Sequence, residues 1–364
     1  MINHLLVFFV CASFGAKLCA GELDQSRYDR ELGTFGTLEV HDVNGQLVEL
    51  TKERGPPSDL KGDITFKLYT KRTPSEGREL KINDATSLKN SGFDPSRPTY
   101  MITHGWQNNE NTYLANIDAN VIVIDWSSYS MSVYYIDVTY KVKEVGEVVQ
   151  QFIKWLYENG LKADDVTLVG HCLGAHVVGL AGYGLTPKVN NIVGLDPALP
   201  MFFYANNSEA ISREDANHVQ IIHTNRGMLG SLNLSGHSDF FPNGGTLQPR
   251  CCGRRVAGCV ACSHDRAYVF FAESIAKSFV GTQCDSYSNF IAGYCDDDYY
   301  YDYEDPLTAR MGGLNLSSVR PGAYYLRTNP AKLFSRLTRG STGSALVALP
   351  KITDVPCSSH YDVD

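Results

Sequence analysis

The segment around Cys172 constrains the fold of this chain more than any other. An apolar run at residues 166–169 has the pattern of a buried strand, and apolar residues at helical spacing follow from residue 175. Between them, Gly170 and Gly174 flank Cys172 two positions away on either side. Side chains at the two glycine positions would collide with the incoming strand or the outgoing helix. The pattern therefore predicts a strained strand-to-helix turn that presents the Cys172 thiol at the end of a strand.

Strands and helices alternate along most of the remaining sequence. Strand patterns lie at residues 64–68, 100–103, 120–126, 191–195 and 218–223, and helical patterns at 142–157 and around 270–275. Pro and Gly at residues 74–77 predict a break, and residues 224–250 predict a long Gly-rich loop. The central strands are too apolar for one face to meet water, so we expect a parallel or mixed sheet covered by helices on both sides. Active sites in such sheets lie at the carboxyl ends of the strands.

Two residues downstream of Cys172 fit the partners that a nucleophile needs, a base and a carboxylate that orients the base. Asp196 follows directly after the 191–195 strand, and His264 lies further along, in the sequence CSHDRA. This chain order of nucleophile, acid and histidine is typical of enzymes that carry the nucleophile on a strand-to-helix turn. Taken singly, Asp196 also fits a turn or helix-cap residue and His264 a surface histidine. The strand end and the chain order together favour a triad of Cys172, Asp196 and His264.

Two backbone amides are candidates for holding a developing oxyanion. The amide of Leu173 lies at the predicted helix N-terminus, where N–H groups have no partner within the helix. The second candidate is the amide of Trp106, in the His-Gly-Trp sequence that follows the 100–103 strand. The alternative for Trp106 is a loop residue with a buried indole.

A series of ordered motifs between residues 64 and 329 resembles the pancreatic-type lipase family, including secreted sn-1-specific phospholipases of insects. The motifs are PTYMITHGW, NVIVIDW, VTLVGHCLGAHVVGLAG, IVGLDPALPMF, HVQIIHTN, GHSDFFPNGG, CSHDRAYVFFAESI and GAYYLRTN. The resemblance implies an α/β-hydrolase fold, with a mostly parallel sheet between helices, and a lipid ester as substrate. It also assigns the triad positions to Cys172, Asp196 and His264, and the oxyanion amides to Trp106 and Leu173.

By the same resemblance, a disulfide-closed lid precedes the histidine motif and here would run from Cys251 or Cys252 to Cys262. So short a lid resembles the phospholipase branch more than the triacylglycerol lipases. Two features depart from the family pattern. Cys172 stands in place of the nucleophilic serine, and only a few residues link Trp106 to the 120–126 strand.

The cysteine leaves two hypotheses open. A neighbouring histidine can draw the proton from a thiol, so that Cys172 attacks an ester carbonyl. The thiolate, whose thiol has an ordinary pKa of about 8.5, is then a better leaving group than the ester's alkoxide, and the intermediate tends to revert. The first hypothesis is therefore a hydrolase of phospholipid or acylglycerol esters with reduced activity. The second is a non-catalytic lipid-binding or storage protein on the lipase fold.

The N-terminus predicts a secreted, extracellular protein. Residues 1–20 have the apolar run and the small-residue end of a signal peptide, and the alternative is a retained anchor. We expect one lipase-like domain over residues 21–345 and a C-terminal tail over residues 346–364. No later segment is apolar enough to span a membrane. The net charge of −8 argues against a nucleic-acid partner.

Seven of the ten cysteines lie after residue 250, which predicts disulfides in an oxidising compartment. Short loops favour pairing Cys284 with Cys295, and Cys262 with Cys252 or Cys251. The cluster at 251, 252, 259 and 262 also has the spacing of a zinc site, but oxidation disfavours it. We expect no metal ion and no cofactor.

Three sequons for N-glycosylation begin at Asn206, Asn233 and Asn315. They fit the predicted secretion, and a glycan on Asn233 would lie beside the expected mouth of the site. We expect the protein to be a monomer.

Overall fold

The computed structural model describes residues 37–41, 47–51, 63–105, 118–132, 135–251, 257–295, 308–314, 316, 320–330 and 333–335. Within them, 11 strands form one sheet in the order β12-β11-β13-β10-β9-β8-β7-β5-β6-β3-β4. A separate antiparallel hairpin is made by β1 (Thr37–His41) and β2 (Leu47–Thr51). The expected signal peptide and C-terminal tail both lie outside the described residues.

The centre of the large sheet is parallel. Its strands are β5 (Thr99–Thr103), β6 (Asn120–Asp125), β7 (Val166–His171), β8 (Asn191–Leu195), β9 (His218–Ile222), β10 (Ser238–Pro242) and β13 (Gly322–Leu326). All residues of β7, β8 and β10 are buried, as parallel strands covered on both faces require. Their carboxyl ends therefore meet along one edge of the sheet.

Antiparallel strands complete both ends of the sheet. On one side β3 (Thr65–Thr70) pairs with β6 and with β4 (Thr73–Leu80). On the other side β11 (Val280–Gln283) pairs with β13 and with β12 (Thr308–Arg310). The sheet is therefore mixed and mostly parallel.

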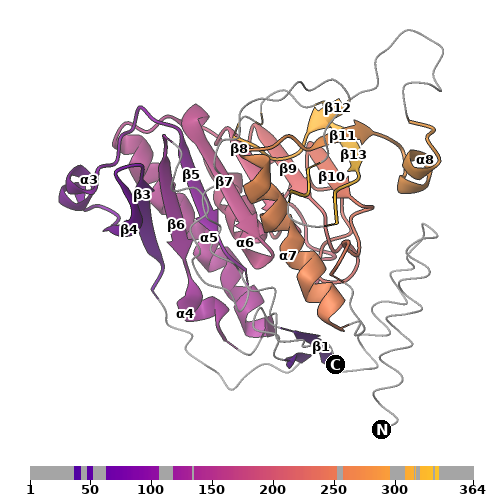
Figure 1. Cartoon of the computed structure of the whole chain (residues 1–364). Helices are drawn as coiled ribbons and strands as arrows, with labels where there is room; N and C mark the ends of the chain where they lie inside the picture. Colours follow the sequence, from indigo (N-terminus) through magenta and orange to yellow (C-terminus); the bar gives the residue numbers. More distant parts are fainter. Residues whose placement is uncertain are drawn as a thin grey trace.

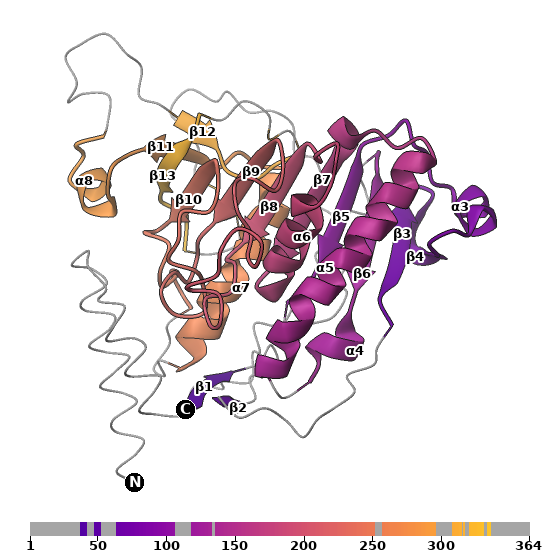
Figure 2. The same cartoon turned by 180° about the vertical axis from the view of Figure 1, so that it is seen from behind.

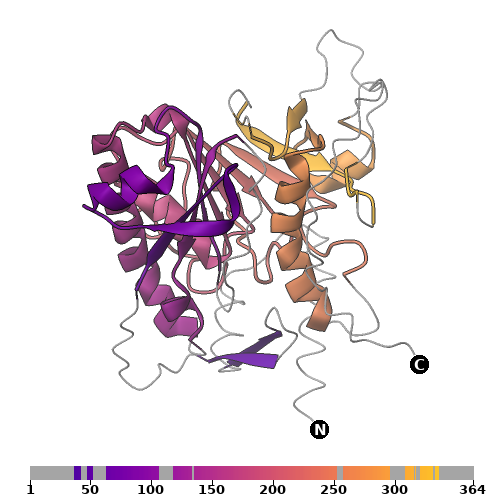
Figure 3. The ribbon, with the colours of Figure 1, turned by 60° about the vertical axis from the view of Figure 1, so that its left-hand side comes forward.

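Helices cover both faces of the sheet. Figures 1 and 2 show α5 (Tyr135–Glu158) and α6 (Leu173–Tyr183) on one face and α7 (Ala257–Ser274) on the other, and Figure 3 shows the same layers nearly edge-on. The ring of Phe152 on α5 stacks on Phe66 of β3, with centroids 3.7 Å apart. Short elements complete the described fold: α3 (Ala85–Ser91), α4 (Ser127–Ser130), the 3₁₀ turn Ala163–Asp165 and α8 (Tyr287–Ile291).

This arrangement is the α/β-hydrolase fold that the sequence predicted. Each predicted strand is present, with ends shifted by at most two residues. The predicted helices are present but longer, since α5 begins at Tyr135 and α7 at Ala257. Two local predictions were wrong. The 74–77 break is part of β4, where Pro74 is tolerated because an edge strand has an unpaired side. The predicted loop 224–250 contains β10, whose short apolar run is hidden between turn residues. Within the described residues, no helix is long and apolar enough to cross a membrane.

Candidate active site

Cys172 lies on the strained turn between β7 and α6. Its backbone has φ 58° and ψ −122°, an unfavourable conformation for a residue with a side chain. A Cβ on Gly170 would lie 2.2 Å from the carbonyl oxygen of Gly174, and one on Gly174 would lie 2.4 Å from that of His104. The two glycines are therefore required by close backbone packing, as the sequence predicted for this elbow.

Cys172 is half-buried, and among the described residues it is a free cysteine. Gly105 packs directly against it, since a Cβ there would lie 2.5 Å from Cys172 Cβ and 3.3 Å from Sγ. Leu173 is the first residue of α6, so its N–H points out of the helix end beside Cys172. Trp106, the other oxyanion candidate, lies outside the described residues.

His104 anchors the loop that carries Gly105. Its Nε2 lies 3.4 Å from Asp125 Oδ1, and its carbonyl accepts a 3.0 Å hydrogen bond from Trp126 Nε1. The hydrogen bond from His104 lowers the pKa of Asp125 well below its usual range. The carboxylate therefore stays ionised and fixes His104.

Asp196 and His264 meet at the carboxyl edge of the sheet. Asp196 follows β8 and is fully buried, and His264 is buried in α7. His264 Nδ1 donates a 2.6 Å hydrogen bond to Asp196 Oδ2. The other carboxylate oxygen accepts from the amides of Thr224 at 2.8 Å and Asn225 at 3.0 Å. Asp196 therefore holds the imidazole in one tautomer and orientation.

The second ring nitrogen of His264 lies on the side away from Asp196. This Nε2 is buried and forms no hydrogen bond of regular geometry with any described residue. Burial disfavours the imidazolium, but the thiolate charge of Cys172 and the hydrogen bond to Asp196 outweigh it, and the pKa of His264 is raised well above 6.5. A negative charge on the Cys172 sulfur therefore favours the protonated form of His264.

Two side chains hold the backbone of His264. Its carbonyl accepts a 3.2 Å hydrogen bond from Thr224 Oγ1 and lies 3.3 Å from His171 Nε2. The rings of His171 and His264 are 4.5 Å apart. Burial and the charge of His264 keep the pKa of His171 well below 6.5, so this neighbour is neutral. Thr224 is notable because its amide binds Asp196 while its hydroxyl binds His264.

Comparison with known proteins decides the family. The model of the family described as Lipase matches residues 27–329. This chain belongs to the Lipase family. Inactive pancreatic lipase-related protein 1 of Mus musculus is 32% identical over 317 residues, which are 77% of this chain and 66% of that relative. Lipoprotein lipase of Homo sapiens is 35% identical over 272 residues, 64% of this chain and 56% of that relative.

The chain spans between about half and two thirds of the length of the curated Lipase-family relatives it matches, 54% for one and 66% for another. Among solved structures, a putative dienelactone hydrolase from Klebsiella pneumoniae overlaps 46% of this chain and 76% of its own, at 12% identity. Its TM-score of 0.30 is too low to add to the fold assignment.

A disulfide fixes the segment just before His264 in this Lipase-family chain. Cys262 pairs with Cys251, one of the two partners that the sequence left open, and not with Cys252. Cys252 itself lies outside the described residues, and Cys259 is also disulfide-bonded. With these sulfurs oxidised, a zinc site at the cluster is not supported. Among the described residues no group of three or more His, Cys, Asp or Glu is placed to hold a metal ion.

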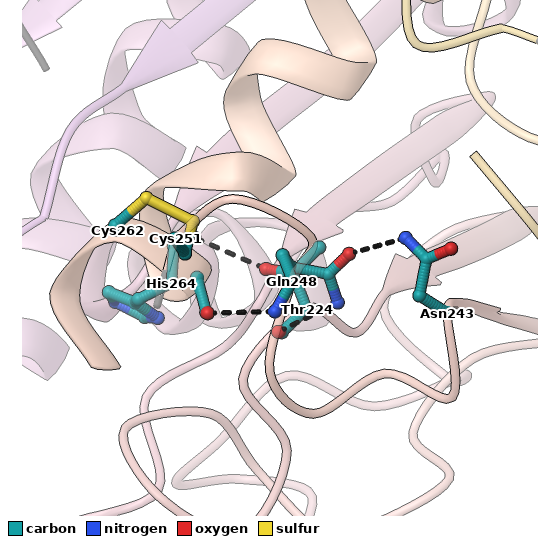
Figure 4. The surroundings of a disulfide bond; sticks show 7 residues. Thr224, Asn243, Gln248, Cys251, Cys262 and His264 are labelled. Atoms are coloured by element: carbon teal, nitrogen blue, oxygen red, sulfur yellow. Dashed lines mark hydrogen bonds between the residues drawn. A yellow bond between two sulfur atoms is a disulfide. The ribbon is translucent and has the colours of Figure 1, made fainter. Parts of the chain in front are cut away.

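Gln248 joins this disulfide to the triad, as Figure 4 shows. Its backbone N–H donates to Ser263 Oγ at 2.9 Å, and its carbonyl accepts from the Cys251 amide at 3.1 Å. Its buried side chain donates to the Thr224 carbonyl at 3.1 Å and accepts from Asn243 Nδ2 at 2.9 Å. The base of the lid, the end of β9 and the residue before His264 therefore form one hydrogen-bonded unit.

The remaining predicted residues lie away from the triad. Cys284 and Cys295 form a disulfide, the pair that the short loop favoured. Asn206 and Asn233 are exposed and line one cavity of about 230 Å³, which does not include any triad residue in its lining. Asn315 lies outside the described residues.

Sequence analysis missed four residues that position the triad. They are His104, His171, Thr224 and Gln248. One signal was available for Thr224, which comes two residues after β9, next to the end of β8. For His171 the signal was its place within the elbow. No sequence signal marked Gln248, because its hydrogen-bond partners Thr224 and Ser263 are distant in sequence.

Proposed function

We propose that this protein is a secreted carboxylic ester hydrolase that acts on lipid esters through Cys172, His264 and Asp196. One observation carries the proposal: a fully buried carboxylate orients His264, while the opposite ring nitrogen is left for the thiol on the strained turn. A histidine with a purely structural role has no need of a nucleophile at that position. Relatives named as lipases support the same reaction class.

Acylation would begin from the ion pair. The Cys172 thiolate attacks the ester carbonyl carbon, and the carbonyl oxygen takes up the negative charge. The amide of Leu173 supports this oxyanion, and the amide of Trp106 is the proposed second donor. His264 then passes the proton on Nε2 to the departing alcohol oxygen. This transfer reduces the obstacle for a cysteine without removing it, because a protonated alcohol leaves more readily than an alkoxide.

Deacylation would reverse the role of His264. Once Cys172 carries an acyl group, its negative charge is gone, and with it the largest influence that raises the pKa of His264. The neutral imidazole can then take a proton from water, which attacks the thioester carbonyl. Asp196 stabilises the imidazolium that forms, and the Cys172 thiolate leaves.

The substrate is proposed from the surroundings of the site. The disulfide of Cys251 and Cys262, with a sequence separation of 11, closes the segment that the family resemblance assigns to the lid. So short a segment favours a phospholipid or acylglycerol that enters without a large cap movement. Rate should then rise without a jump when substrate passes its solubility limit.

Secretion and glycosylation belong to the same proposal. The disulfides among the described residues favour an oxidising compartment. Asn206 and Asn233 are exposed, so both sequons are accessible to a glycosyltransferase. A monomer is the simplest state for an enzyme whose triad comes from one chain.

A second candidate function is a non-catalytic lipid-binding or storage protein. The observation favouring it is the thiol at the serine position, together with a relative named as inactive. In that case Cys172 would be a small buried residue at an inherited turn.

One assay separates the two candidates. Purified full-length protein is incubated with a phospholipid, a triacylglycerol and an activated p-nitrophenyl ester, and fatty acid or p-nitrophenol release is measured. Turnover of any substrate that is lost in His264→Ala supports the hydrolase. Lipid binding without turnover of any substrate supports the carrier.

A further inference from the structure

We infer that acyl thioesters of small thiols, rather than alkyl esters, are the substrates best matched to this site. The inference rests on the proposed function, in which Cys172 is the nucleophile. It names a class of leaving group that the family resemblance does not imply, and it follows from the chemistry of sulfur at the elbow.

The argument starts from the tetrahedral intermediate. That intermediate holds the Cys172 sulfur and the leaving group on one carbon. A thiol has a pKa of about 8.5, whereas the pKa values of water and alkyl alcohols are about 15. With an alkyl ester the sulfur of Cys172 departs more readily, and the intermediate reverts. With a thioester both groups are thiolates, and the intermediate collapses forward about as often as backward.

The proton on His264 has a different role for the two substrates. An alkoxide must receive it before the C–O bond breaks. A thiolate does not need it, so the C–S bond breaks while the imidazolium still stabilises the oxyanion and the departing sulfur. Attack by the Cys172 thiolate, without prior proton transfer to the leaving group, is thus sufficient for the first step with a thioester.

The full cycle balances without another reactant. Cys172 Sγ forms a bond to the acyl carbon, the substrate C–S bond breaks, and the thiolate takes the proton from His264 Nε2. Water then gives one proton to Nε2 and its oxygen to the acyl carbon, and the Cys172 sulfur leaves with the bonding electron pair. The products are a fatty acid and a free thiol.

The described geometry places the free Cys172 on the strained turn, at the same end of the sheet as the Asp196-bound imidazole of His264. Cys172 is half-buried, so part of the residue is exposed to solvent. The other cysteines described are in disulfides, so the substrate's thiol leaves without a competing free thiol in this part of the chain.

The test compares two substrates that differ in one atom. Decanoyl-N-acetylcysteamine and decanoyl-N-acetylethanolamine carry the same acyl chain and the same leaving-group skeleton. We expect the thioester-to-oxoester ratio of kcat/KM to be at least about 100-fold larger in the wild type than in Cys172→Ser. Equal ratios in the two proteins overturn the inference.

p-Nitrophenyl decanoate distinguishes the two possible failures. If the wild type cleaves this aryl ester but shows the same thioester preference as Cys172→Ser, only the inference fails. If it cleaves neither aryl ester nor thioester, the proposed hydrolase fails with it.

The wild type alone supplies a second measurement in case Cys172→Ser is inactive. Across the alkyl, trifluoroethyl and p-nitrophenyl decanoates, kcat/KM should rise steeply as the leaving group becomes more acidic, and the thioester should lie near the aryl ester. A flat dependence on leaving group overturns the inference.

Discussion

Two buried histidine–aspartate pairs lie around the ends of β8 and β9, and they differ in the group that lies beside the imidazole ring. His264 binds Asp196 at 2.6 Å and turns its other nitrogen toward Cys172. His223 binds Asp239 at 2.9 Å, and its ring lies flat against Phe241 with centroids 4.5 Å apart. Each imidazole binds a carboxylate, His264 through Nδ1 and His223 through Nε2. Only the first has a nucleophile beside it.

The second pair serves the first through the chain. His223 directly precedes Thr224 and Asn225, whose amides bind Asp196. Asp239 also accepts from the Gly236 amide at 3.2 Å, which fixes the start of β10. The pair of His223 and Asp239 therefore holds in place the backbone that binds Asp196. A buried histidine–aspartate contact is not in itself a sign of catalysis.

Exchange of each aspartate for asparagine should separate the two pairs most strongly. Asp196→Asn keeps the volume but removes the charge and favours the wrong tautomer of His264, so kcat on a p-nitrophenyl ester should fall by about 10⁴-fold. Asp239→Asn should leave kcat within about tenfold of the wild type, because it touches no reacting atom. Steady-state kinetics on variants with unchanged circular dichroism measures both. Equal losses of kcat in the two variants would show that the two pairs do not differ in their role in catalysis.

The second pair should instead dominate stability. Asp239→Ala leaves a buried imidazole and the Gly236 amide without their partner, so the free energy of unfolding should fall by about 3 kcal/mol. Glu144→Ala is the matched control, since it removes an exposed partner of Lys141 and should cost less than about 0.5 kcal/mol. Urea unfolding followed by fluorescence gives both values. A loss from Asp239→Ala no larger than the control's would refute the supporting role.

The substitution Cys172→Ser tests whether the pair of His264 and Asp196 can activate a nucleophile on the elbow. An alkoxide from serine is as poor a leaving group as the alkoxide of the substrate, so the intermediate no longer reverts in preference. Hydrolysis of an alkyl ester should rise by about 10- to 100-fold over the wild type. The rate of fatty acid release from a soluble short-chain ester measures it. A serine variant that stays inert on every ester favours the carrier function.

Thr224→Val should give the smallest effect, because it removes one hydrogen bond from the support of His264. The hydrogen bond from the residue 224 amide to Asp196 remains, while the hydrogen bond from the hydroxyl to the His264 carbonyl is lost. The value of kcat should therefore fall by about three- to tenfold with KM unchanged. Thr224→Ser keeps the hydroxyl and should retain wild-type kcat. If both variants behave alike, the hydroxyl has no positioning role.

The fold was predictable because its signals are local. The parallel strands that were predicted are short apolar runs, and the elbow is marked by two glycines that close backbone packing requires. Cys172 and Asp196 each directly follow a predicted strand, and His264 comes after both in the chain. These features depend on neighbours in sequence.

The missed features depend on contacts between distant segments. Gln248 joins Thr224, Ser263 and Asn243 only after folding, and nothing in its own sequence indicates this. The choice of Cys251 over Cys252 as partner of Cys262 is likewise set by three-dimensional geometry, since the two candidates are adjacent. β10 was missed because Ser238 and Asp239 are polar residues buried by their tertiary partners.

Alkylation of Cys172 by iodoacetamide as a function of pH tests the central claim, that His264 and Cys172 form a charged relay, most directly. Because the pKa of His264 is raised, the imidazolium should persist through neutral pH and favour the thiolate form of Cys172 beside it, so we expect the thiol to react at a lower pH than a free cysteine. We predict a rate at about pH 6 at least tenfold above that of a free cysteine, and in His264→Ala a fall to the free-cysteine rate. Mass spectrometry of the Cys172 peptide follows the reaction. The relay would be contradicted if the wild-type rate rose with a midpoint at a pH of about 8.5, as for an ordinary thiol, and were unchanged in His264→Ala.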